Sequence, residues 1–75
     1  MRPQPSDLLL LHTAERVYVF VVGSNQDSFQ FLHALYEDAL ARARRTAAQA
    51  RVDVWETKDG FSFAVVARHR LRSAL

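Results

Sequence analysis

The sequence predicts an α+β domain in which one helix packs on one face of a four-stranded, mainly antiparallel sheet. Three observations support this fold class. Residues 52–68 alternate apolar and polar side chains on both sides of a Lys-Asp-Gly turn, the pattern of a β-hairpin. Residues 8–23 hold two apolar runs separated by a polar tetrapeptide, and residues 28–49 repeat apolar side chains at helical spacing. The predicted order of elements is therefore ββαββ.

The first part of the chain predicts a leader followed by two strands. Residues 1–6 contain two prolines, which disfavour a helix, so we expect a flexible leader before a single domain at 7–75. Leu8–His12 is a short apolar strand candidate, and Thr13–Arg16 is a plausible turn. Val17–Gly23 is rich in β-branched and aromatic residues, which favour a strand.

The middle of the chain predicts one long helix, from about Ser28 to about Gln49. Asp27 is a suitable N-cap, because Gln30 follows it at the spacing of a capping box. The apolar side chains of this segment fall in one arc of a helical projection: Phe29, Leu32, Tyr36, Ala39, Leu40, Ala43 and Ala47.

The hairpin is the strongest local signal in the sequence. Its first strand is Val52–Thr57, and its turn is Lys58–Gly60, where Gly60 is free to take a positive φ. Its second strand begins at Phe61 and runs to about Arg68. We expect the last seven residues to extend that strand or to form a short basic turn.

Size and composition limit the classes of protein that the chain represents. A domain of 75 residues has a thin core, and without cysteine it has neither disulfides nor a Cys-based zinc site to support that core. The apolar runs are far shorter than the roughly 20 residues of a membrane-spanning helix. The first residues make a poor signal peptide, so we expect a cytoplasmic protein that does not bind a membrane.

The strand at Val17–Gly23 is apolar on both faces, and this predicts a partner. If Val17, Val19 and Val21 face the helix, then the alternate side chains face away from it. One helix covers only one face of a sheet, so the other face needs a second copy, another protein or the chain's own tail. We therefore predict a homodimer through the sheet, with an interface that includes Tyr18, Phe20, Val22, Phe31 and Trp55.

The charges are unevenly distributed, which suggests a second kind of partner. Residues 1–41 carry two basic and five acidic side chains, a net charge of −3, whereas residues 42–75 carry eight and three, a net charge of +5. Two groups of arginines near the helix end and in the tail would neutralise phosphates if the fold joined them. The candidate nucleic-acid contacts are Arg42, Arg44, Arg45, Arg51, Arg68, Arg70 and Arg72.

The sequence favours a protein without catalytic activity. It holds no phosphate-binding loop, no nucleophile elbow and no cofactor motif, so we expect neither a cofactor nor a metal. His33 and Glu37 lie four residues apart and are the only reason to keep a metal protein or small hydrolase as a third possibility. The resulting hypothesis is a small regulator or inhibitor of another protein, a type common among the proteins of mobile elements. The alternative hypothesis is a nucleic-acid-binding accessory protein.

Overall fold

The described part of the chain forms three strands, one helix and two further strands. The structure, a computed structural model, describes residues 2–70. The elements are β1 (Leu8–His12), β2 (Val17–Val21), β3 (Ser28–His33), α1 (Tyr36–Ala50), β4 (Val54–Thr57) and β5 (Ala64–Ala67). The α+β class and the single helix are as predicted.

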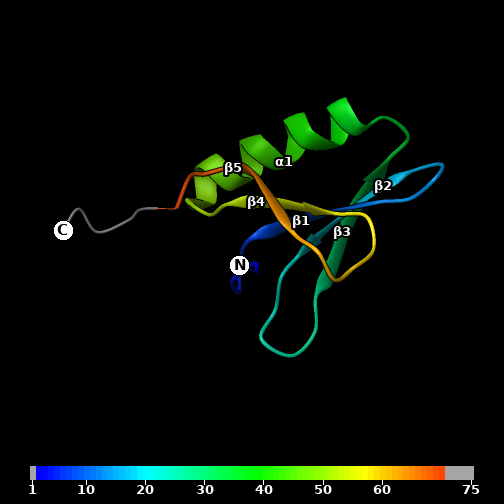
Figure 1. Ribbon diagram of the computed structural model, residues 1–75. Helices are drawn as coiled ribbons and strands as arrows, with labels where there is room; N and C mark the ends of the chain where they lie inside the picture. The colour runs from blue at the N-terminus through cyan, green and yellow to red at the C-terminus, as the bar shows by residue number, and fades with distance from the viewer. Residues whose placement is uncertain (1, 71–75) are drawn as a thin grey trace.

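All five strands belong to one mixed sheet, in the order β3-β2-β1-β4-β5. The pairs β1–β2, β2–β3 and β4–β5 are antiparallel, and the central pair β1–β4 is parallel. Because β2, β3 and α1 lie between β1 and β4 in the sequence, this pair is a long-range contact. Figure 1 shows α1 lying along one face of the sheet.

The prediction of four strands was wrong, because the expected helix is shorter and a strand precedes it. Residues 28–33 form β3, which pairs with β2 along its length. Phe29 and Leu32 fit the apolar arc of a helix, yet a short apolar run suits a strand equally well. The pairing with β2 satisfies the backbone of this segment and decides between the two. Asp27 therefore does not cap the helix.

The helix begins at Tyr36 and ends at Ala50. Glu37 and Asp38 lie in its first turn, where negative charge complements the helix dipole. Arg51 follows the last turn in the left-handed conformation, with φ 58°. The predicted end of the helix was therefore close to the observed one, and the predicted start was not.

The core lies between α1 and the sheet. Ala39, Ala43 and Ala47 are fully buried on the inner side of the helix. Since alanine side chains are small, the helix approaches the sheet closely. The buried side chains that meet these alanines come from three strands and from the segment before β4: Leu8, Leu10, Val17, Val19, Val52 and Val54. Val17 and Val19 thus face the helix, which decides between the two assignments of faces that the sequence left open.

Candidate interaction surface

The face of the sheet opposite α1 is the open face. Its side chains alternate along the strands with the core side chains: Leu9, Leu11, Tyr18, Phe20, Phe29, Leu32, Trp55, Thr57 and Val65. The register aligns these side chains in two rows across the sheet. Phe29, Phe20, Leu9, Trp55 and Val65 form one row, and Leu32, Tyr18, Leu11 and Thr57 form the other.

Part of the open face is covered by the chain itself. Leu9, Trp55 and Thr57 are buried although they point away from the helix. The leader lies beside Leu9, where Pro3 and Pro5 line the same hollow. The leader is held by hydrogen bonds from the Ser6 N–H to the Val22 carbonyl at 2.8 Å, from the Gln4 N–H to the Asp7 carboxylate at 3.0 Å and from the Asp7 N–H to the Gln4 carbonyl at 3.0 Å. Arg70 Nη2 also donates to the Pro5 carbonyl at 3.3 Å.

Between the covered and the uncovered parts of the face lies an apolar hollow of about 210 Å³. Leu11, Phe20 and Phe63 form its apolar wall, and Asp27 and Gly60 are also among the lining residues. A neighbouring hollow of about 330 Å³ shares Phe63 and Asp27 with it and extends below the leader.

Two of the large apolar side chains that remain exposed lie on the edge strand of the open face, whereas a third, Leu35, which is 61% exposed, lies just before α1. Phe29 is 52% exposed and Leu32 is 42% exposed, both on β3. Phe29 contacts the rings of Tyr18 and Phe20, at centroid distances of 6.2 and 5.8 Å. These residues extend the apolar surface from the hollow to the edge strand.

The loop between β4 and β5 presents a further exposed side chain, Phe61, which is 86% exposed. Asp59 orders this loop, because its Oδ1 accepts hydrogen bonds from the N–H groups of Ser62 and Phe61, each at 2.8 Å. These two hydrogen bonds, with that to Ser62 the larger effect, hold the pKa of the Asp59 carboxyl below its usual value. Gly60 has a φ of 81°, so the predicted positive φ is confirmed.

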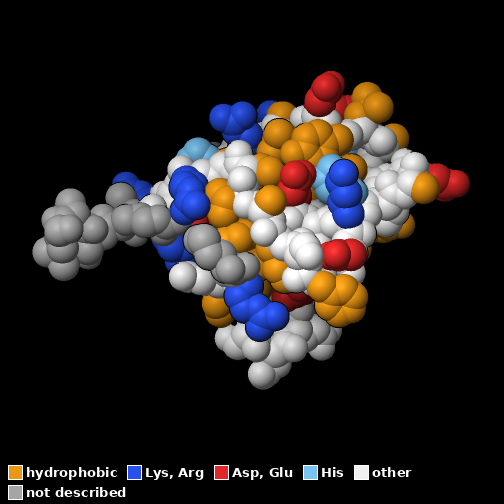
Figure 2. Space-filling model, in the orientation of Figure 1, with side chains coloured by type: hydrophobic (Ala, Val, Ile, Leu, Met, Phe, Trp, Pro, Cys, Tyr) orange, Lys and Arg blue, Asp and Glu red, His pale blue; other side chains and the backbone are white. Residues whose placement is uncertain are grey.

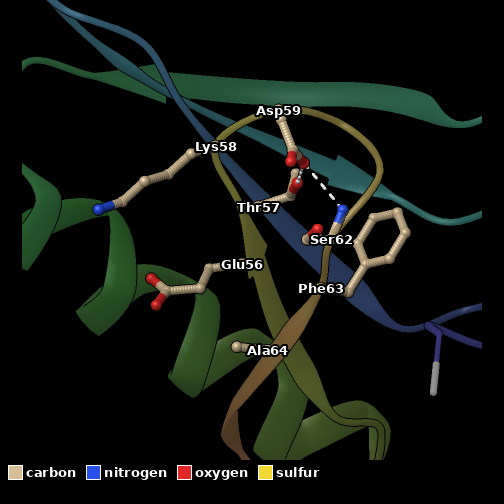
Figure 3. Close-up of a pocket in the computed structure, with 7 residues that line it drawn as sticks. All are labelled: Glu56, Thr57, Lys58, Asp59, Ser62, Phe63 and Ala64. Atoms are coloured by element: carbon tan, nitrogen blue, oxygen red, sulfur yellow. Dashed lines mark hydrogen bonds between the residues drawn. The ribbon is translucent and has the colours of Figure 1, made fainter.

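The side chains around this loop separate onto the two faces of the sheet, as Figure 3 shows. Glu56 and Lys58 point toward α1, and Phe63 points the other way, toward the open face. The hollow of about 340 Å³ that these residues line therefore lies at the rim of the sheet, between a charged side and an apolar side.

A polar cluster lies on the helix side of the sheet, at the start of α1. His12 Nε2 lies 3.0 Å from Glu56 Oε2, and the His12 ring stacks on Tyr36 with 4.6 Å between centroids. Burial raises the pKa of the Tyr36 phenol, and its hydrogen bond to Glu56 and the charge of that carboxylate raise it further. These three residues join β1, β4 and α1 through one set of contacts.

The structure places the five predicted interface residues in four environments. Tyr18 and Phe20 are half-buried on the open face, and Val22 lines the hollow below the leader. Trp55 lies on the same face but is only 4% exposed. Phe31 lies on the helix face, where the guanidinium carbon of Arg42 sits 3.9 Å from the centre of its ring.

The candidate nucleic-acid contacts are likewise divided. Arg44, Arg45, Arg51 and Arg68 are exposed. Arg42 packs on Phe31, and Arg70 forms an ion pair with the buried Asp7. Arg72 lies outside the described residues. Figure 2 shows Lys and Arg side chains gathered toward the side of the molecule where α1 and β5 end.

The possible metal pair does not share a helix face. His33 ends β3 and Glu37 lies in the first turn of α1, so the helical spacing on which the pair depended is absent. Within residues 2–70, no three His, Asp or Glu side chains come close enough together to hold a metal ion.

Sequence reasoning did not place Phe29 and Leu32 on the open face, because it assigned both to the buried side of a helix. The available signal was the segment Ser28–His33 itself, which carries two phenylalanines and no charge. Aromatic residues are enriched in strands, and such a segment after an apolar strand also fits a hairpin.

Comparison of the chain with models of protein families, with curated proteins and with solved structures gave no match. In the part of the chain that the structure describes, no helix is long and apolar enough to cross a membrane.

Proposed function

We propose that this chain is a non-catalytic protein-interaction domain, a regulator or inhibitor of another protein, that acts as a homodimer through its sheet. The observation that carries this proposal is the uncovered part of the open face. There Phe29 and Leu32 are about half exposed beside an apolar hollow that Phe20 lines. Exposed apolar surface of this kind is typical of interaction sites.

The energetics favour a partner on this surface. Removing about 100 Å² of apolar surface from water stabilises a complex by about 2.5 kcal/mol. Exposed side chains such as Phe29 and Leu32 therefore supply a large part of the free energy of association when a partner covers them. This gain is large beside the free energy of unfolding of so small a domain, which is about 5 kcal/mol.

The polar groups around the hollow support binding rather than chemistry. Asp27 Oδ1 accepts a hydrogen bond from the Gly23 N–H at 3.2 Å, and Asp59 orders the loop between β4 and β5. The Thr57 hydroxyl accepts a hydrogen bond from the Gly60 N–H at 2.9 Å. Each of these groups holds a loop in place around an apolar surface.

Sedimentation velocity over the micromolar concentration range tests the proposal. The wild-type protein is expected to sediment as a dimer, and Phe29→Glu is expected to sediment as a monomer, because it places a charge on the uncovered surface. Ala41→Glu is the matched control, since it adds the same charge at an exposed helix position. A wild-type protein that is a folded monomer at all these concentrations contradicts the homodimer.

A nucleic-acid-binding function is the second proposal, favoured by the exposed arginines near the ends of α1 and β5. Fluorescence anisotropy with a labelled single-stranded oligonucleotide at two salt concentrations tests it. Arg44→Ala combined with Arg45→Ala is expected to weaken binding and to reduce its dependence on salt. Arg16→Ala, in the turn between β1 and β2, is the control. No binding at low salt, or binding that the double variant leaves unchanged, refutes this function.

A further inference from the structure

Strand β3 is an edge of the sheet that has a β-bulge but no charged residue or proline to protect it. It lies at one end of the strand order, and no other described strand pairs with its outer side. Its six residues include no charge, no proline and no glycine. Exposed edges in native proteins are commonly short or carry lysine or proline, which prevents pairing with other chains. The opposite edge, β5, has four residues and is followed by Arg68.

A β-bulge determines which side chains of β3 share a face. The register pairs Val19 with Phe31 and Phe20 with Phe29, so Gln30 is the extra residue. Phe29 and Leu32 consequently both lie on the open face, although they are three residues apart. By the same pairing, Ser28, Phe31 and His33 lie on the helix face.

We propose that β3 pairs antiparallel with β3 of a second copy, around a two-fold axis between Gln30 and Phe31. This register places Ser28 opposite His33 of the second copy, and both lie on the helix face. It places Phe29 opposite Leu32 of the second copy, and both lie on the open face. Two residues that lie opposite each other in an antiparallel pair must point to the same face of the sheet. Residues 29 and 32 do so only because the bulge adds one residue between them.

This pairing also indicates that the outer side of β3 binds a second copy of the chain rather than another protein. Phe29 and Leu32 are the exposed large apolar side chains of the described strands, and one symmetry operation packs each against the other. The strand contains no Asp, Glu, Lys or Arg, so the two-fold axis does not bring two like charges together. The two sheets would become one continuous sheet, with both helices on the same face. The hollow lined by Leu11, Phe20 and Phe63 would remain free for another protein.

This inference rests on the proposed homodimer and specifies its interface. The test is sedimentation velocity of the wild-type chain, Leu32→Lys and Phe61→Lys. We expect a wild-type dimer, a dissociation constant at least tenfold higher for Leu32→Lys, and a dimer of unchanged affinity for Phe61→Lys. Phe61 is the control because it is more exposed than Leu32 but lies on the loop between β4 and β5. Circular dichroism and thermal melting establish that each variant is folded.

The outcomes separate this inference from the proposal on which it depends. A wild-type dimer that Leu32→Lys leaves intact, or that Phe61→Lys disrupts instead, overturns pairing through β3 and leaves the homodimer standing. A wild-type chain that is monomeric overturns both. If Leu32→Lys is unfolded, Leu32→Thr replaces it, because threonine is well tolerated in a strand and removes most of the apolar contact.

Disulfide trapping tests the register, because the chain has no cysteine of its own. The Phe29→Cys and Leu32→Cys variants are mixed and oxidised. Directly opposite residues are close enough for a disulfide, whereas residue 29 lies roughly 10 Å along the strand from residue 29 of the other copy. We expect the mixture to form a cross-linked dimer at least fivefold faster than either variant alone. The register is overturned if either variant alone cross-links as fast as the mixture does. It is also overturned if the mixed proteins form dimers but do not cross-link.

Discussion

The indole N–H of Trp55 donates a hydrogen bond to Oδ2 of Asp7, 3.0 Å away. The other carboxylate oxygen of Asp7 accepts a hydrogen bond from the Asp53 N–H at 3.0 Å and pairs with the guanidinium of Arg70. Asp7 is only 1% exposed. One buried carboxylate therefore joins the start of β1, the start of β4 and the segment after β5, and it fixes Trp55 on the open face.

Asp7→Ala is expected to lower the free energy of unfolding by about 3–5 kcal/mol, because it leaves buried donors and the Arg70 charge without their acceptor. Urea denaturation followed by Trp55 fluorescence measures the change. Asp27→Ala is the control, since the Asp27 carboxylate is exposed and accepts one backbone hydrogen bond, from Gly23. A loss below about 1 kcal/mol for Asp7→Ala would show that this network contributes little to stability.

Ala43→Leu is expected to destabilise the fold by about 1–3 kcal/mol, because Ala43 is completely buried between α1 and the sheet and a larger side chain has no room there. Ala41→Leu is the matched control, since residue 41 is an exposed position of the same helix. Thermal melting compares the two variants. An equal stability of both would mean that the helix packs less closely on the sheet than the buried alanines indicate.

Local signals in the sequence were sufficient for β1, β2, the antiparallel pairing of β4 with β5 and the end of α1, although β5 begins at Ala64 rather than at the predicted Phe61 and the turn is a longer loop. They were not sufficient for β3, because Phe29 and Leu32 satisfy a helical and an extended pattern equally. The choice is made by pairing with β2, which is a tertiary contact. The parallel pairing of β1 with β4 is likewise absent from local patterns, since three other elements separate these strands in the sequence.

The open face was predictable in part. The alternation of Val17, Val19 and Val21 with Tyr18 and Phe20 requires an apolar face away from the helix, and the structure has one. The burial of Trp55 was not predictable, because the partner of its indole N–H is Asp7, which is remote in the sequence. A buried carboxylate next to an apolar strand looks, in the sequence, like any polar residue before a strand.

The Tyr36 phenol is expected to titrate above its ordinary value of 10.0, because burial and then the Glu56 carboxylate disfavour the phenolate. A group whose pKa is raised by folding stabilises the protein fully below the unfolded value. That stability is lost as the pH rises from 10.0 through the folded pKa. Ultraviolet absorbance of the phenolate measures the titration, in a Tyr18→Phe background so that Tyr36 is the tyrosine that remains.

Glu56→Gln separates the two causes of this shift. Glutamine keeps a hydrogen-bond acceptor near the Tyr36 hydroxyl and removes the negative charge, so the pKa is expected to fall toward 10.0 but to stay above it, since burial is the larger cause. Glu37→Gln removes a charge from the first turn of the same helix and is the control. A Tyr36 pKa that responds equally to both variants would mean that the general charge of the region, rather than the contact with Glu56, controls the phenol.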